Sequence, residues 1–403
     1  MLVIFILSIP TSSHAYEFTR NVYAALGLNL DNIAEKFTSY DLLEVKKPNG
    51  EIDYDRIKLL LSQKKAFRKI TMNYKVSTRG KHITIAGAVG NPPYQDPDGG
   101  NKASAVPLYQ ELCSVAKKLD GRYVSLVIPA KWFTGGRAVL DTFRVQMLHD
   151  NSICKINDYP DSKDCFPGVD IAGGSCYFLR DSKYQGDCEF VSNRRGQVFT
   201  SKRDLSMYDI LVRYDEALSI LSKIKKIKEP TYESKVSSQK PFGLRTYVTP
   251  TEKGDIQLRY SGGIGPFERD KVTTKVEWID KFKVIMSYLT YDHAGRPDKD
   301  GKRRIFSTMD LLPPGVICTE TYIVIDVFNT KKEAENLIKY LKTNFVRFLV
   351  GLISTTQHIS KNSFSFVPVQ DFSKSWTDEK LYAKYGITES EQKFIESLIK
   401  PME

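Results

Sequence analysis

The tetrapeptide Asn91-Pro92-Pro93-Tyr94 combines residue types that could hold a reacting group. It follows the apolar run 83–90, which is typical of a buried parallel strand. Successive prolines remove two N–H donors, so the turn presents the Asn91 side-chain oxygen and the two proline carbonyls as acceptors. With the Tyr94 ring beside them, these acceptors suit the exocyclic amino group of a planar base or amide. An ordinary Asn-Pro turn without chemistry is the alternative.

The tetrapeptide resembles the catalytic motif of amino-methyltransferases that use S-adenosylmethionine, above all the DNA adenine-N6 methyltransferases. Longer segments are similar to bacterial restriction-modification adenine methylases, and most similar to the Eco57I-like methylases. This resemblance covers roughly residues 80–403. The segments that show it are 128–136, 166–179, 319–322, 376–382 and 385–386.

The resemblance implies a role for each residue of the motif. The Asn91 side chain and a proline carbonyl, that of Pro93, would hold the target amine, and Tyr94 would stack on an adenine flipped out of the duplex. Two hydrogen bonds to the amine localise its lone pair and stabilise the positive charge that develops during methyl transfer. Asp41 stands where the family has an acidic residue that accepts from the adenine amine of S-adenosylmethionine. It is equally interpretable as a turn or helix-cap residue.

One part of the family pattern is missing. The family binds the methionine half of its cofactor with an acidic residue and a glycine-rich loop after the first strand, where glycine lets the backbone approach the ligand. Upstream of Asn91, the segment 24–28 has one glycine and no acidic lead. Three explanations stay open: a truncated reading frame, a second polypeptide that supplies this part, or a catalytically inactive chain.

Strand and helix patterns alternate through the first half of the chain and indicate an α/β fold. Strands are expected at 123–129, around 153–156 and at 175–179, with helices between Leu108 and Leu119 and between Leu140 and Met147. We expect a Rossmann-like methyltransferase domain over residues 1–235, incomplete at its amino terminus. A further amphipathic helix covers Met207 to Ile224.

The second half, residues 236–403, is expected to be an α+β target-recognition domain. Its clearest strand is 321–328, and its main helix begins at Thr330 and continues to Leu352. A capping-box pattern from Thr388 to Glu391 predicts a final helix. The composition changes between residues 230 and 245, and this change places the boundary.

The chain has 59 Lys and Arg against 48 Asp and Glu, a net charge of +11 that favours a polyanionic partner. We expect double-stranded DNA, with basic side chains neutralising phosphates or reading guanine edges. A solvated loop is the alternative for each basic residue. The candidates lie in two loops: Arg194, Arg195, Arg296, Lys302, Arg303 and Arg304.

The six cysteines form no CxxC pair, and no Cys/His set has the spacing of zinc ligands, so we expect no metal. The segment 1–15 imitates a signal peptide but lacks its positively charged start, and its apolar stretch is too short to span a bilayer. We therefore expect a cytoplasmic protein with reduced thiols and no membrane partner.

The function expected from these patterns is site-specific transfer of a methyl group from S-adenosylmethionine to adenine N6, as part of a restriction-modification system. A separate polypeptide for the missing part, or a restriction subunit, is an expected partner. Two alternatives remain: a remnant that binds DNA without catalysis, and an RNA or protein-glutamine methyltransferase. No pair of acidic residues near a lysine has the spacing of a nuclease site, so no cleavage is expected.

Overall fold

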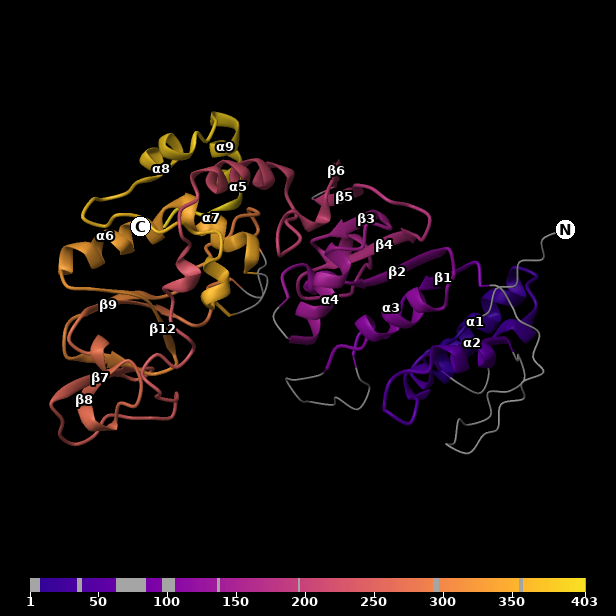
Figure 1. Cartoon of the computed structure of the whole chain (residues 1–403), viewed down its shortest axis with the longest axis horizontal. Coiled ribbons are helices and arrows are strands. Elements are labelled where there is room, and N and C mark those ends of the chain that lie inside the picture. Colours follow the sequence, from indigo (N-terminus) through magenta and orange to yellow (C-terminus); the bar gives the residue numbers. More distant parts are fainter. Residues whose placement is uncertain are drawn as a thin grey trace. The chain divides into compact units, whose positions relative to one another are not determined.

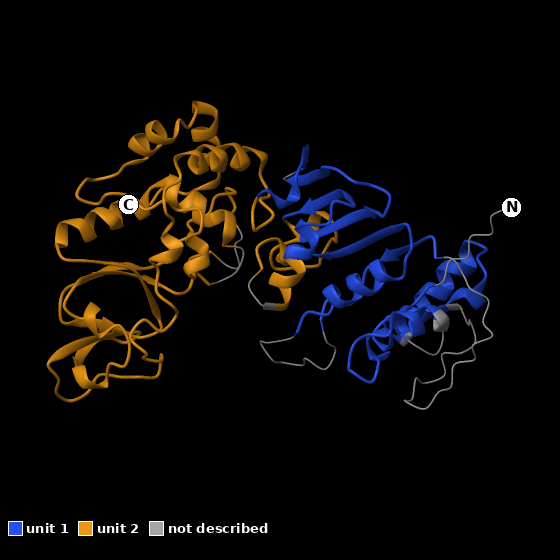
Figure 2. Ribbon diagram, viewed as in Figure 1, with its two compact units in different colours: residues 1–130, 145–160, 175–207 blue, residues 131–144, 161–174, 208–403 orange. Residues whose placement is uncertain are grey.

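The computed structural model describes residues 8–34, 38–62, 85–95, 106–135, 138–194, 196–292, 297–354 and 358–402. Contacts divide the chain into two compact units (Figure 2). Unit 1 comprises residues 1–130, 145–160 and 175–207, and unit 2 comprises 131–144, 161–174 and 208–403. Residues 208–235 therefore pack with the second half of the chain, whereas the functional boundary at 235 stays a prediction.

Unit 1 is built on a mixed six-stranded sheet (Figure 1). The strand order is β1-β2-β4-β3-β5-β6. The fold is α/β, as expected, and the sheet is mixed because β4 and β6 are antiparallel to their neighbours. The strands are β1 (Gly87–Gly90), β2 (Tyr123–Pro129), β3 (Ile153–Tyr159), β4 (Ser175–Asp181), β5 (Cys188–Arg194) and β6 (Gln197–Arg203).

Among the described residues, unit 1 contains the helices α1 (Ser13–Ala25), α2 (Tyr54–Ser62) and α3 (Tyr109–Lys118), and helix α4 (Ala138–Leu148) is divided between the two units. Helix α3 follows the predicted apolar spacing, because Leu112 and Val115 on its inward face pack into one core with Leu42, Leu43 and Ile57. This core joins the amino-terminal segment to α3, which lies against β2.

Unit 2 contains two three-stranded sheets, ordered β10-β9-β12 and β11-β7-β8. The chain crosses between the sheets through short turns, and side chains of β9 and β12 contribute to the cores on both sides. The strands are β7 (Ile256–Tyr260), β8 (Gly263–Phe267), β9 (Phe282–Ser287), β10 (Met309–Leu312), β11 (Val316–Cys318) and β12 (Tyr322–Phe328).

Helices cover the β9–β12 sheet and form a large apolar core with it. The helices are α5 (Asp215–Ile227), α6 (Lys331–Lys342), α7 (Asn344–Ile353), α8 (Asp378–Tyr385) and α9 (Glu389–Leu398). The helix expected from Met207 begins only at Asp215. The long helix expected from Thr330 is two helices, because Thr343 has an extended backbone and its hydroxyl accepts from the Val346 N–H. The Thr388–Glu391 capping box is confirmed.

None of the six cysteines forms a disulfide, and four of them are buried. Within the described part of the chain, no helix is long and apolar enough to cross a membrane.

Candidate functional site

The candidate site lies where four strands of the unit 1 sheet end. Strands β1, β2, β3 and β5 all run in one direction, since β1 pairs parallel with β2, β3 pairs parallel with β5, and β2 and β3 are both antiparallel to β4. Their carboxyl ends therefore meet at one edge of the sheet, the position at which α/β sheets bind ligands. Asn91 follows β1 at this edge.

Strand β1 confirms the prediction of a parallel strand before Asn91, but the expectation that it is buried is wrong. The strand lies at the end of the sheet, and Val89 is 83% exposed. On the side of β2 the strand fits closely, because a Cβ atom on Gly87 would lie 2.7 Å from the Tyr123 carbonyl oxygen. Glycine at this position allows β1 to pair with β2 in the observed register, and that register sets where the Asn91–Tyr94 turn lies relative to the end of β2.

The turn itself presents Asn91 to solvent, with Pro92, Pro93 and Tyr94 half-buried behind it. Among the described residues, no hydrogen bond to the Asn91 side chain is formed. The Tyr94 carbonyl accepts the Leu108 N–H at 3.1 Å, and an antiparallel bridge joins Gln95 to Pro107. These contacts connect the end of the turn, at Tyr94 and Gln95, to the residues just before α3.

Tyr109, the first residue of α3, supports the Tyr94 ring. The two rings meet edge to face, with centroids 6.5 Å apart and an interplanar angle of 81°. Tyr109 is only 2% exposed, and burial raises the pKa of its phenol far above the ordinary value, with Cys176 and Cys113 adding to the effect. This buried, neutral ring packs against Tyr94 and orients it. The sequence analysis missed it, because Tyr109 reads as one more core residue of a helix.

Arg194 lies at the same edge as Asn91, at the end of β5. Its guanidinium lies over the Phe199 ring, 4.0 Å from the centroid. Four strand spacings separate β1 from β5, which places the two sites ~19 Å apart along the edge. The other predicted residue of this loop, Arg195, lies outside the described residues.

The second predicted basic loop belongs to unit 2, and its members differ in position. The Arg303 side chain is only 16% exposed and points inward. It donates to Asp292 at 3.3 Å and to the carbonyls of Gly351 at 2.9 Å and Ser354 at 2.6 Å. Burial lowers the pKa of its guanidinium, and Asp292 opposes the shift. These contacts give Arg303 a structural role.

Unlike Arg303, Arg304 has its guanidinium beside an exposed aromatic ring. Its guanidinium lies over the half-exposed Tyr291 ring, 4.6 Å from the centroid. The buried Asp292 carboxylate accepts the N–H groups of Arg304 at 3.0 Å and Ile305 at 2.9 Å, and thereby fixes the backbone of the loop. Lys302 is half-buried beside it. Arg296 lies outside the described residues.

Asp292 is the second residue that sequence reasoning missed. Its partners lie 11 to 13 residues along the chain, a separation at which no local pattern signals a contact.

Asp41 does not follow a strand. It opens a short 3₁₀ turn, Asp41–Glu44, and its carboxylate accepts the N–H of Thr38 at 2.6 Å and the Thr38 hydroxyl at 3.0 Å. This is the geometry of a turn residue, the interpretation that competed with the cofactor role.

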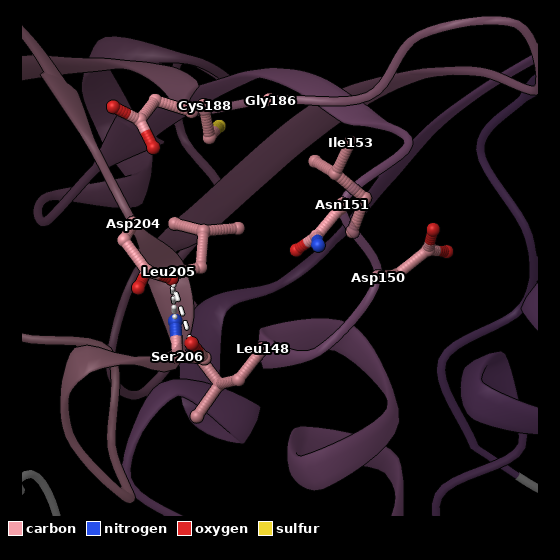
Figure 3. Close-up of a pocket in the computed structure, with 10 residues that line it drawn as sticks. Leu148, Asp150, Asn151, Ile153, Gly186, Cys188, Asp204, Leu205 and Ser206 are labelled. Atoms are coloured by element: carbon pink, nitrogen blue, oxygen red, sulfur yellow. Dashed lines mark hydrogen bonds between the residues drawn. The ribbon is translucent and has the colours of Figure 1, made fainter.

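A cavity of about 200 Å³ lies in unit 1 at the opposite edge of the sheet, beside the starts of β3 and β5 (Figure 3). Two of the carboxylates that line it are engaged: Asp150 pairs with Lys117 at 2.9 Å and Arg180 at 3.1 Å, and Asp204 accepts the N–H of Ser206 at 2.8 Å. Burial raises the pKa of the Cys188 thiol to about 12, so it is not a nucleophile. The cavity therefore offers no catalytic set.

No group of three or more metal-ligating side chains occurs among the residues that the structure describes.

Part of this chain is similar to a known protein family. Residues 6–166 match the Eco57I restriction-modification methylase family. The match includes the carboxyl ends of β1, β2 and β3 but not that of β5. It begins well upstream of residue 80, where the motif resemblance was expected to start.

A curated relative, an "Uncharacterized adenine-specific methylase" of Mycoplasma pneumoniae, is 39% identical over 126 residues. The match covers 29% of this chain and 29% of the relative, so the chain matches less than a third of that protein's length.

Several solved structures with detectable similarity come from restriction-modification systems. The type IIL restriction-modification enzyme MmeI, solved in complex with DNA, is 11% identical. The match covers 69% of this chain and 45% of the MmeI chain, with a TM-score of 0.37. A type I methyltransferase subunit from Streptococcus thermophilus is 13% identical and covers 55% of this chain and 42% of its own, with a TM-score of 0.28. TM-scores this low do not establish a shared fold.

Proposed function

We propose that this chain is a site-specific DNA methyltransferase of a restriction-modification system, which transfers a methyl group from S-adenosylmethionine to adenine N6. The observation that supports it most is the Asn91–Tyr94 turn at the carboxyl end of β1, backed by Tyr109, within a segment that matches a methylase family. The curated relative is named for the same base.

In this proposal the turn holds the target amine. The Asn91 side-chain oxygen and the Pro93 carbonyl accept the two N–H bonds of the flipped adenine, and the Tyr94 ring stacks on its face. Both acceptors belong to a turn anchored by β1 and α3, so they need little reorganisation as positive charge develops on the amine. The half-buried ring also replaces part of the stacking that the base loses when it leaves the duplex.

The described residues do not complete a site for S-adenosylmethionine, which supplies the methyl group as an electrophile on sulfur. Upstream of Asn91 they offer no acidic side chain beside a glycine-rich turn, and the Asp41 carboxylate is already used by Thr38. We therefore assign only the target half of the reaction to this chain's residues.

The exposed edge of β1 supports a partner. Among the described strands β1 pairs only with β2, and an exposed parallel edge strand is unusual because parallel strands are normally covered. We propose that a second polypeptide, such as another subunit of the restriction-modification system, adds the strand and loop that bind the cofactor's methionine half. The same exposed edge of β1 favours the second candidate function, in which this chain by itself binds DNA but transfers no methyl group.

DNA binding is assigned to Arg194 in unit 1 and to Lys302 and Arg304 in unit 2. The guanidinium groups of Arg194 and Arg304 lie over the rings of Phe199 and Tyr291, and a planar guanidinium stacked in this way suits contact with a phosphate or a base. Arg195 and Arg296 stay proposed DNA contacts on the basis of the sequence alone. Arg303 is no longer proposed, because its side chain is bound inside unit 2.

The test replaces Asn91 with alanine and measures label transfer from S-adenosylmethionine to unmethylated DNA. Loss of one preorganised acceptor should lower the rate by about 10²- to 10³-fold and leave DNA binding within a few fold. The matched control is Asn151→Ala, an exposed asparagine at the rim of the cavity on the opposite edge. Equal rates for the Asn91 variant and the control would exclude the turn from catalysis.

A further inference from the structure

The hairpin formed by β7 and β8 in unit 2 presents an unusual pair of side chains. Arg259 and Ile264 face each other directly across the two strands, close to the Ser261–Gly262 turn. Ile264 is 57% exposed, although Phe267 on the same strand is fully packed in the core. An exposed aliphatic side chain beside an arginine at a hairpin tip has no role in packing the unit.

The Arg259 side chain is held in place but leaves its donors unused. Its guanidinium lies over the Tyr322 ring, 5.5 Å from the centroid, and its main-chain carbonyl accepts the Thr319 N–H at 3.1 Å. Its Nε atom is buried and has no hydrogen-bond partner in the described part of the chain. No hydrogen bond from its two Nη atoms occurs among the described residues either, so these two atoms are the donors left for a ligand.

The loop beside β8 adds further exposed groups to this surface. Tyr247 is 80% exposed and the Arg245 side chain 54%. Glu320 holds the loop, because its carboxylate accepts the Thr246 N–H at 3.2 Å and lies 3.8 Å from Arg245. At its far end, the Thr251 N–H donates to the Pro266 carbonyl of β8 at 2.8 Å.

We infer that Arg259 reads a guanine in the target sequence and that Ile264 makes the neighbouring apolar base contact. The inference rests on the proposed function, since it takes duplex DNA as the ligand. A planar guanidinium fixed on a ring offers two parallel N–H donors, which match the N7 and O6 acceptors of guanine in the major groove. A branched aliphatic side chain next to it suits a thymine methyl group.

DNA fits this surface better than a protein does. Arg259 has a guanidinium held on a ring, with its Nη donors unused among the described residues. In contrast, Arg269, in the 3₁₀ turn that follows β8, is already bound by Asp280 at 2.7 and 2.9 Å. The overall charge of +11 also favours a polyanion. Arg245 and Tyr247 then flank the duplex, where a cation and a polar ring contact phosphates.

The experiment is selection of bound sequences from a random duplex library, followed by affinity measurements on the selected site. The full chain is compared with Arg259→Met, which keeps the aliphatic stem on Tyr322, and Arg259→Lys, which keeps the charge but loses the fork. Arg269→Met is the matched control. Thermal unfolding checks that each variant is folded.

We expect the parent chain to select a motif that contains a G·C pair, and both Arg259 variants to lose preference at that one position. Their affinity for the selected site should fall roughly 5- to 150-fold, with non-specific binding unchanged. Ile264→Ser should relax preference at an adjacent position.

The same motif and affinity in both Arg259 variants and the Arg269 control would overturn the inference alone. Uniform loss at every position would also overturn it, because that result is the signature of a phosphate contact. If the parent chain selects no motif at all, the proposed site-specific function fails and the inference fails with it.

Discussion

The contrast between Arg303 and Arg304 gives the sharpest prediction about unit 2, because two neighbouring arginines are assigned opposite roles. Arg303→Met removes a buried cation that donates to Asp292 and to two carbonyls. Breaking a buried ion pair by removing one partner costs about 3–5 kcal/mol. Asp292 keeps its two bonds from backbone N–H groups, so we expect the lower end, ~3 kcal/mol, for this variant.

Arg304→Met should behave in the opposite way. It removes a cation–π contact at the surface, which is worth about 0.5–1 kcal/mol, so the free energy of unfolding should change little. If Arg304 neutralises one phosphate, the slope of log binding constant against log salt should fall in magnitude by about 0.9. Arg303→Met should leave that slope unchanged wherever the variant is folded.

Urea denaturation followed by tryptophan fluorescence measures the first quantity, because Trp132, Trp278 and Trp376, the three tryptophans of the chain, all belong to unit 2. Filter binding at several salt concentrations measures the second. The reasoning is refuted if Arg303→Met unfolds at the same urea concentration as the parent chain, or if it lowers the salt slope while Arg304→Met does not.

Two further predictions concern single side chains. Replacing Tyr109 by leucine should slow methyl transfer and weaken the stacking signal of a fluorescent base analogue placed at the target position. Replacing it by phenylalanine should preserve both, because the Tyr94 ring needs only an aromatic edge behind it. Equal effects of the two replacements would contradict this prediction. Burial lowers the pKa of Lys283 to about 8. Between pH 8 and the unfolded value of about 10.4, the unfolded chain binds the extra proton, so stability should rise with pH by up to about 3 kcal/mol. Lys283→Met should remove this rise, and an identical pH profile of urea denaturation in the variant would show that Lys283 is not its source.

Much of unit 1 was predictable because its signals are local. Strand β2 coincides with the predicted run from Tyr123 to Pro129, which a glycine-containing turn and a proline bound. The direction of β4 was not predictable. A buried central strand has the same apolar pattern whether its neighbours are parallel or antiparallel, so only the long-range pairing decides.

The break between α6 and α7 shows the same limit. The apolar spacing continues through Thr343, and helix propensity alone predicts one helix. The chain instead starts a new helix there, because the Asp378 carboxylate accepts the N–H groups of Asn344 at 2.9 Å and Phe345 at 2.8 Å. Such a partner, more than thirty residues away, leaves no trace in the local sequence.

The candidate site divides in a similar way. The Asn91–Tyr94 turn is a contiguous motif after a strand, and the structure places it at the carboxyl edge of the sheet as expected. Support from Tyr109 and the inward orientation of Arg303 both depend on contacts between segments. Charge in a loop indicates a possible DNA contact, but the acidic partner that removes Arg303 from the surface appears only in the fold.

The most direct test of the central claim is mass spectrometry of nucleosides from unmethylated DNA incubated with this chain and S-adenosylmethionine carrying a labelled methyl group. The account predicts labelled N6-methyladenine at one sequence motif, and its loss in the Asn91→Ala variant but not in Asn151→Ala. Label on another base, equal label in the Asn91 variant, or no label even when the other subunits of the system are added would contradict it.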